Sequence, residues 1–200
     1  MINQIFWRKI SPFFDVFINK SYPVHFTWKF YNLINFFRFV EKEGLSLDEK
    51  RKELERFVFY SDRYLTHLNS LKFDKDLYKM ASQKAEEVEL FNMGIQEAQF
   101  LKNAVDILCK CRKTLMYTYV FGFYLDKNNQ KVIFEENQKD LESAIDTLSG
   151  YLEREVTSVA DLKDMKAKVL DKSTYCEMRR KVMAAHVYEG NDKDWWYFRG

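Results

Sequence analysis

Cysteine and histidine are the residues of this sequence that could bind a metal ion or act as nucleophiles, and there are three of each. A structural zinc ion needs four ligands in closely spaced pairs, because one tetrahedral ion must hold two loops together. Cys109 and Cys111 are two positions apart, which on a helix points their side chains about 200° from each other, so they cannot chelate as a pair. The sequence therefore predicts no zinc site. The complete set is Cys109, Cys111, Cys176, His25, His67 and His186.

Nucleophilic catalysis is equally poorly supported by the spacing of these residues. A reactive thiolate needs a nearby base, and spacing assigns no partner to His67 or His186. The sequence also contains no glycine-rich phosphate loop, no nucleophile elbow and no His-Glu metal motif. We therefore expect no catalytic residue, no metal and no cofactor in this chain.

The composition favours helices and restricts the classes of partner. Hydrophobic residues make up 46% and charged residues 31%, whereas Gly (6) and Pro (2) are too scarce for a turn-rich β architecture. A net charge of +2 gives little long-range attraction to nucleic acid or anionic lipid, so a charged partner must be met by a local patch, and the charge alone leaves the partner class open. Our expectation is that neither nucleic acid nor a membrane is a partner. Three cysteines are too few and wrongly spaced for a disulfide framework, which fits a reducing compartment. This predicts a cytoplasmic protein, and a nuclear location is the alternative. No secretory signal or long apolar run is recognisable, which predicts a soluble chain.

The first 40 residues differ in composition from the rest, because they hold nine of the 18 Phe and both Pro but no Ala, Gly or Glu. We predict a loosely ordered aromatic-rich segment over residues 1–45 and a helical domain over residues 46–200. Three interpretations of the segment stay open. It packs on the helical domain or on a partner; it forms an amphipathic helix at a membrane surface; or residues 1 to about 38 are translated intron sequence, since Phe, Ile, Asn, Lys and Tyr are amino acids with AT-rich codons. Sequencing the transcript across this point separates the last interpretation from the others.

Helical signals become regular after Gly44. Ser46 and Glu49 form a capping box, and apolar residues then recur with helical spacing. The sequence predicts an all-α fold, an antiparallel bundle of about four long helices with short connections, in which the apolar helix after Gly94 is central. The aromatic run Trp195–Phe198 should pack against the bundle, and a contact with a partner is the alternative. The expected helices run from Leu47 to Leu71, from near Asp74 to an interruption at Asn92–Gly94, from there to Asp126, from Val132 to Glu153 and from Ala160 to Tyr188.

Several residue strings resemble one family closely. The match covers about three quarters of the chain, runs in the family's order and is nearly without gaps. The strings include Tyr60–Tyr64, His67–Phe73, Gln99–Arg112, Thr114–Val120, Leu148–Arg154, Tyr175–Arg180 and Glu189–Asp194. They identify the chain as similar to the Ariadne domain of RING-between-RING (RBR) E3 ubiquitin ligases, in their C-terminal part.

This resemblance implies a regulatory function in protein ubiquitination. In that family RING1 recruits a ubiquitin-loaded conjugating enzyme, RING2 carries the cysteine that accepts ubiquitin, and the Ariadne domain folds back on RING2 until a neddylated cullin-RING ligase binds. The zinc-binding residues of RING1, the in-between module and RING2 are missing from this sequence. We therefore expect a chain that is inactive alone, with two partners: RING2, in cis or in trans, and a neddylated cullin-RING ligase. A conjugating enzyme would be reached only through the missing RING1.

The resemblance also implies which residues face RING2. By position these autoinhibitory contacts are Phe73, Asp74, Glu135 and Asp146, with Asp74 and Asp146 standing where the family usually has Glu. Structural alternatives remain, since Phe73 could pack at a turn between helices and Asp74 could cap the second helix. A different hypothesis is a stand-alone helical adaptor or scaffold that binds a protein partner through its aromatic N-terminus.

Overall fold

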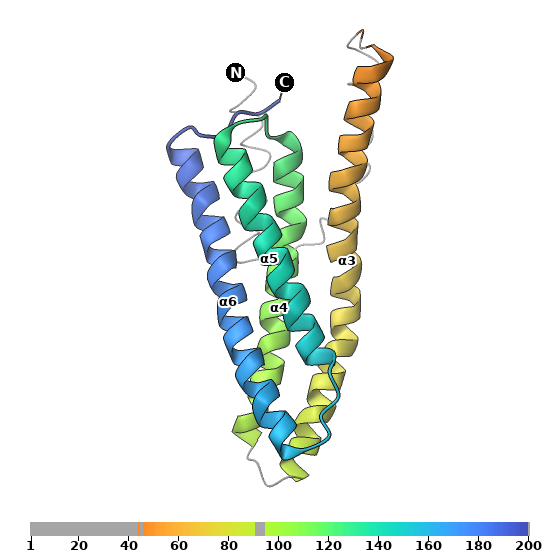
Figure 1. Cartoon of the computed structure of the whole chain (residues 1–200), viewed down its shortest axis with the longest axis vertical. Coiled ribbons are helices and arrows are strands. Elements are labelled where there is room, and N and C mark those ends of the chain that lie inside the picture. Colours follow the sequence, from red (N-terminus) through yellow and green to blue (C-terminus); the bar gives the residue numbers. More distant parts are fainter. Residues whose placement is uncertain (1–43, 45, 91–94, 200) are drawn as a thin grey trace. The chain divides into compact units, whose positions relative to one another are not determined.

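A computed structural model describes residue 44, residues 46–90 and residues 95–199 (Figure 1). Within this part of the chain the secondary structure is helical, with one isolated β-bridge and no strand, so the all-α expectation is confirmed. Residues 1–43 of the predicted aromatic-rich segment and the predicted interruption at Asn92–Gly94 lie outside the described residues. No described helix is both long and apolar enough to cross a membrane. The helices, labelled as in Figure 1, are α3 (Leu47–Leu90), α4 (Ile95–Tyr124), α5 (Asn129–Glu153) and α6 (Val159–Asp192).

The chain divides into two units after Asp62, and the described part of the first unit is the N-terminal end of α3. The predicted capping box is confirmed there. The Ser46 amide donates to Glu49 Oε2 at 2.9 Å, and the Glu49 amide donates to Ser46 Oγ at 3.4 Å. These bonds satisfy backbone donors that the first helical turn leaves without a partner. Leu54 and Val58, two of the apolar residues that recur with helical spacing after the capping box, are exposed.

The two helices expected before Gly94 are one helix in the structure. α3 continues from Leu47 to Leu90 without ending at Leu71, so the prediction that a second helix starts near Asp74 is wrong. Asp74 is therefore not an N-cap residue. Its carboxylate lies in the middle of α3 and is buried, and it contacts Cys109 and Arg112 of α4 instead of backbone N–H groups at a helix N-terminus.

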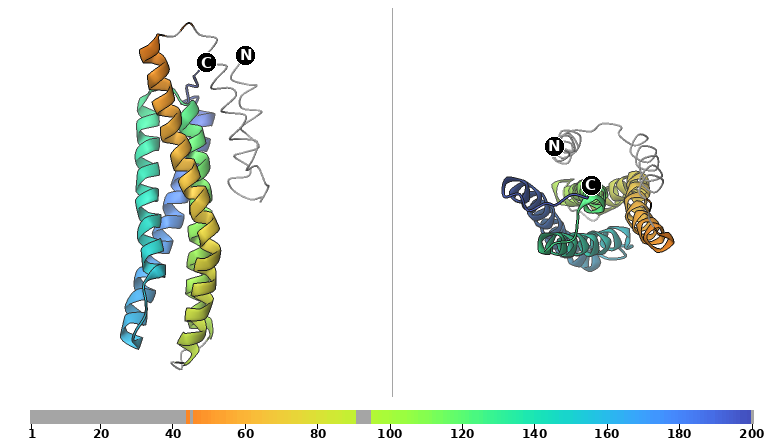
Figure 2. Two further views of the ribbon diagram at one scale, coloured as in Figure 1. Left: turned by 90° about the vertical axis from the view of Figure 1, so that its right-hand side faces the viewer. Right: turned by 90° about the horizontal axis from the view of Figure 1, so that it is seen from above.

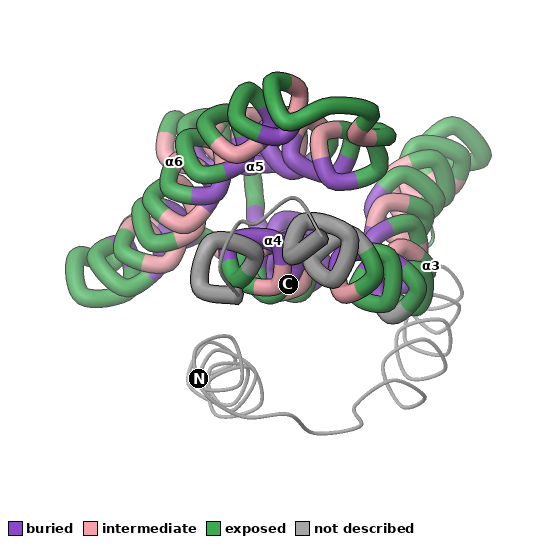
Figure 3. Tube along the Cα trace, turned by 90° about the horizontal axis from the view of Figure 1, so that it is seen from below, coloured by how far each residue is buried: buried purple, intermediate pink, exposed green. Residues whose placement is uncertain are grey.

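The second unit, Arg63–Arg199, contains the remainder of α3 together with α4, α5 and α6. The last three helices pack side by side and alternate in direction (Figures 1 and 2), as expected for helices joined by short connections. Their buried residues face one another (Figure 3). α4 packs on both α5 and α6 and also contacts α3, which agrees with its predicted central place. Side chains at most 1% exposed form this core: Leu101, Ala104, Val105, Leu108, Cys111, Leu115, Phe121, Leu125, Phe134, Leu141, Ile145, Leu148, Val169, Cys176 and Met183.

Side-chain caps set where α5 and α6 begin. Asn128 Oδ1 accepts a hydrogen bond from the Lys131 amide at 2.7 Å, so α5 begins at Asn129, inside the segment that the sequence suggests is a turn. Ser158 Oγ accepts a hydrogen bond from the Asp161 amide at 3.1 Å, so Ser158 is the N-cap and α6 begins at Val159. Both caps are residue types that favour this position because their oxygens reach free backbone N–H groups.

The aromatic run after α6 packs against the bundle through Trp196, as predicted. This side chain is 6% exposed, its ring centroid lies 5.2 Å from that of Phe121, and its Nε1 donates to the Val187 carbonyl at 3.1 Å. The backbone then follows the end of α4, where the Asp126 amide donates to the Tyr197 carbonyl at 2.7 Å. Tyr197 itself is exposed. The segment thus closes one end of the core.

Candidate functional site: a polar seam between three helices

A row of polar side chains joins the second half of α3 to α4 and α5. Each helix contributes two of them, and the two are always seven residues apart, which is about two helical turns or 10 Å. Because neighbouring helices run in opposite directions, the six side chains form two layers, with one residue of each helix in each layer. We call this set the polar seam: His67 and Asp74 of α3, Arg112 and Tyr119 of α4, and Glu142 and Ser149 of α5.

The first layer is centred on the Glu142 carboxylate. His67 Nε2 lies 3.2 Å from Glu142 Oε1, and the Tyr119 hydroxyl donates to Glu142 Oε2 at 2.9 Å. The His67 and Tyr119 rings are stacked, with centroids 5.7 Å apart. The hydrogen bond from His67 is the main cause that lowers the pKa of Glu142, against the opposing effect of burial. This layer therefore favours an ionised carboxylate between α3, α4 and α5.

The second layer is centred on Arg112, which lies between α3 and α5. Its Nη2 donates to Ser149 Oγ at 2.9 Å, and its Nε lies 3.6 Å from Asp74 Oδ1. Cys109 Sγ donates to Asp74 Oδ2 at 3.3 Å. Burial raises the pKa of Asp74, and Arg112 opposes that rise. The carboxyl group is thus held inside the protein by a guanidinium group and a thiol.

The structure separates the four residues that the resemblance places against RING2. Phe73 is 69% exposed, whereas its neighbour Asp74 is 4% exposed and faces the seam. Asp146 is exposed on α5, where burial and the nearby Glu142 raise its pKa while His67 and Arg112 lower it. The Asp146 carboxyl group is therefore close enough to both layers for their charged groups to affect its pKa. Phe73 and Asp146 are thus accessible at the surface, and Asp74 is not.

Glu135, the fourth of these residues, is not part of the seam. It precedes Asp146 by three turns of α5, a separation of roughly 16 Å along the helix. Its carboxylate lies 3.7 Å from Lys131 Nζ, and that ammonium group also donates to the Leu125 carbonyl at 3.0 Å. The structure thus places Glu135 beside the start of α5, well away from Phe73 and Asp74.

The thiols in this part of the structure are poor nucleophiles. Burial raises the pKa of Cys109 to about 12 and that of Cys176 to about 11, and it raises the pKa of Cys111 as well. A thiol with so high a pKa has almost no thiolate at neutral pH, and the thiolate is the reacting form. Cys109 contacts Asp74 on α3, whereas Cys111 is fully buried in the core, which agrees with their expected opposite directions. The described residues also contain no group of three or more His, Cys, Asp or Glu that could hold a metal ion.

The lowered pKa of Glu142 predicts a pH dependence. A carboxyl group whose folded pKa lies below its ordinary value of 4.5 stabilises the fold above that pH, and the contribution disappears as the pH falls further. Glu142→Gln should therefore be less stable than the parent chain at pH 7, and the gap should narrow progressively below about pH 4.5. Urea unfolding of both proteins between pH 7 and pH 3 measures this. A gap that is constant over this range would contradict the assigned cause.

Four of the six seam residues have no signal in a search for apolar periodicity or for local motifs, namely His67, Arg112, Glu142 and Ser149. Tyr119 lies on the apolar stripe of its helix, which predicts packing and not its hydrogen bond to Glu142. The signal of the seam is the spacing of seven residues between polar side chains on each of three successive helices, which only becomes visible when the helices are aligned antiparallel. Asp74 alone of the six was singled out by the resemblance.

Comparison with known proteins assigns the family. The family model of the Ariadne domain matches residues 55–189. The chain is 56% identical over 151 residues to E3 ubiquitin-protein ligase ariadne-1 of Drosophila melanogaster, which covers 76% of this chain and 30% of the relative. It is 55% identical over 151 residues to human E3 ubiquitin-protein ligase ARIH1, covering 76% and 27%, and 46% identical over 148 residues to E3 ubiquitin-protein ligase ari-1.1 of Caenorhabditis elegans, covering 74% and 30%. The chain thus spans less than a third of the length of these relatives. On this match, the chain belongs to the Ariadne domain family.

Proposed function

We propose that this chain is a regulatory Ariadne domain that restrains the RING2 module of an RBR ubiquitin ligase and by itself transfers no ubiquitin. The observation that carries the proposal is the exposure of Phe73, a large aromatic side chain that is 69% accessible beside the buried Asp74 carboxylate, which contacts Cys109 and Arg112. An isolated exposed aromatic residue is unremarkable. Here it coincides with the position at which the resemblance implies a RING2 contact.

In this proposal the exposed residues contact RING2 directly, and the buried seam residue Asp74 positions Phe73. Phe73 and Asp146 are the groups that touch RING2, since both are exposed. Asp74 acts indirectly: it holds α3 against Arg112, and so determines where the neighbouring Phe73 lies. A restraint of this kind is a coupling free energy between closed and open arrangements, typically about 1 to 3 kcal/mol. A neddylated cullin-RING ligase would activate by binding the open arrangement more tightly.

Inhibition in trans tests the proposal. Saturating amounts of this chain, added to an Ariadne-type ligase from which the Ariadne domain has been deleted, should slow ubiquitin transfer to the RING2 cysteine by roughly 5 to 150-fold, the range that this coupling energy gives. Phe73→Ala and Asp146→Lys should each relieve most of the inhibition. Val132→Ala, at an exposed apolar position on α5, is the matched control and should inhibit like the parent chain. Transfer that proceeds at full rate with the parent chain present would contradict the proposal.

The same assay without the ligase tests intrinsic inactivity. Incubated with a charged conjugating enzyme alone, the chain should form no reducible ubiquitin adduct at Cys109, Cys111 or Cys176, because their raised pKa values leave almost no thiolate. An adduct on any of them would show a ligase activity that this proposal denies. The adaptor alternative depends on residues 1–43, outside the described structure, and predicts that partner binding is lost when they are deleted.

A further inference from the structure

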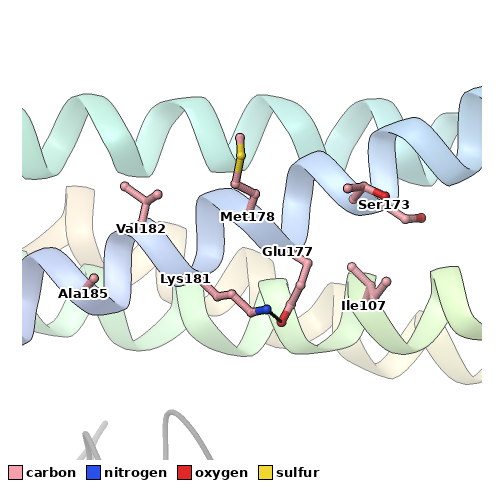
Figure 4. Close-up of a pocket in the computed structure, with 8 residues that line it drawn as sticks. Ile107, Ser173, Glu177, Met178, Lys181, Val182 and Ala185 are labelled. Atoms are coloured by element: carbon pink, nitrogen blue, oxygen red, sulfur yellow. Dashed lines mark ion pairs between the residues drawn. The ribbon is translucent and has the colours of Figure 1, made fainter.

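A groove between α4 and α6 has no part in the polar seam. Its volume is about 600 Å³, and its lining is mostly apolar (Figure 4). The seam lies between α3, α4 and α5, so the groove uses a different pair of helices. Its lining residues are Ile107 of α4 and Ser173, Thr174, Glu177, Met178, Lys181, Val182 and Ala185 of α6.

The apolar part of the groove follows one face of α6. Thr174, Met178, Val182 and Ala185 recur at intervals of four, four and three residues, and all four are exposed. Together they extend over about 17 Å of helix, the length of three turns. Met178 is 49% exposed, although it is an unbranched side chain that adapts readily to an apolar partner. This spacing and length fit the ridge of one further helix lying in the groove.

The rim of the groove carries an excess of positive charge. Arg180 Nη2 donates to Glu177 Oε1 at 2.7 Å, and Lys181 Nζ lies 3.9 Å from the same oxygen. Lys110 is exposed one turn beyond Ile107 on α4, and its charge contributes to lowering the pKa of Glu177. Three cations thus surround one carboxylate, and the Lys181 side chain is 71% exposed. The rim can therefore accept further carboxylates from a partner.

Ser173, in the wall of the groove, has a hydroxyl group without a hydrogen-bond partner among the described residues. Its side chain is 5% exposed. A buried hydroxyl without a partner costs free energy. Because the Ser173 oxygen has almost no exposed surface, a bound helix could satisfy it only if the side chain turned toward the groove.

From this combination we propose that the α4/α6 groove binds an amphipathic helix of a partner protein, with an apolar ridge against Met178 and Val182 and carboxylates facing Lys110 and Lys181. The apolar spacing along α6 specifies a helix, and the surplus of rim cations specifies an acidic one. The groove is independent of the RING2-facing residues Phe73 and Asp146. The chain would thereby hold two partners at once, one on each side of the bundle core.

A pair of synthetic peptides tests this proposal on the full chain. Both are helical, roughly 14 residues or four turns long, with leucine at i, i+4, i+7 and i+11; one has glutamate on its flanks and the other lysine. Fluorescence anisotropy should show the glutamate peptide binding at least about tenfold more tightly, a difference of about 1.4 kcal/mol. Met178→Glu should weaken that binding by a similar factor, and Lys110→Glu should remove the preference for glutamate. Val132→Glu, an exposed apolar position outside the groove, is the control and should bind like the parent chain.

Several results would overturn the inference. Equal affinity for the two peptides, or binding that survives Met178→Glu, would show that the groove is not the site. A concentration-dependent dimer of the parent chain that Met178→Glu abolishes would make a second copy the occupant, and flotation with phosphatidylserine vesicles that Met178→Glu abolishes would make it a lipid surface. None of these readouts involves ubiquitin transfer, so the RING2 proposal stands or fails separately.

Discussion

Replacing Arg112 by methionine should lower the free energy of unfolding by about 3 to 5 kcal/mol, the cost of leaving one partner of a buried ion pair alone. Asp74 would keep only the Cys109 thiol, and Ser149 would lose its donor. The pKa of Asp74 is already raised by burial, so in the variant this carboxyl group should take up a proton more readily still. Urea unfolding monitored by circular dichroism measures the change.

Two further variants separate the buried pair from surface electrostatics. Arg51→Met breaks an exposed pair with Glu55, whose charged atoms are 3.0 Å apart, and should cost less than about 0.5 kcal/mol. Adding Asp74→Leu to Arg112→Met should recover much of the lost stability, because it removes the stranded charge and supplies an apolar side chain. If Arg112→Met costs no more than Arg51→Met, the second layer of the seam contributes nothing to folding.

A single methyl group at Gly190 should destabilise the domain by about 1 to 3 kcal/mol, the usual range for an overpacked core. A Cβ atom there would overlap the indole ring of Trp196, closer than real Cβ contacts come. To make room, the ring must shift, which disturbs its packing against Phe121 and its hydrogen bond to the Val187 carbonyl. Thermal unfolding, together with the loss of buried tryptophan fluorescence, measures the effect.

Gly150 provides the opposite expectation within the same protein. A Cβ at this position, in the last turn of α5, would have no atom within 4 Å apart from its chain neighbours and the adjacent backbone of its own helix. Gly150→Ala should therefore stabilise the chain by about 0.5 to 1 kcal/mol, because alanine loses less backbone entropy in a helix. A melting temperature that falls in both variants would mean that glycine is needed at these positions for a reason other than the Trp196 contact.

Local chemistry predicts most of the helix ends in this chain. The capping box at Ser46 and Glu49 depends on neighbours in sequence, and the structure shows those contacts. The prediction fails at Asp74 because the same carboxylate that can cap a helix can also be buried by residues of another helix. Arg112 and Cys109 lie 38 and 35 residues further along the chain, so no local pattern contains their contact with Asp74.

The candidate site divides in the same way. Resemblance located Phe73 and Asp146, which are exposed, but it treated Asp74 as equivalent to them, and the structure places that carboxylate in the interior. Arg112 and Glu142, which hold the seam together, looked like ordinary charged residues of amphipathic helices. Their partners become apparent only when three helices are aligned, because each layer combines one residue from each of them.

The two layers of the seam also determine how α3 is aligned lengthwise along its neighbours. If α3 slid by two turns in one direction, the Asp74 carboxylate would face the Glu142 carboxylate; in the other direction, the His67 imidazole would face the Arg112 guanidinium. Both displaced alignments bring like or competing groups together, whereas an apolar contact would tolerate either shift. Four charged or titratable side chains therefore determine the register of this long helix: His67, Asp74, Arg112 and Glu142. Exchanging His67 and Asp74 would destabilise the present register.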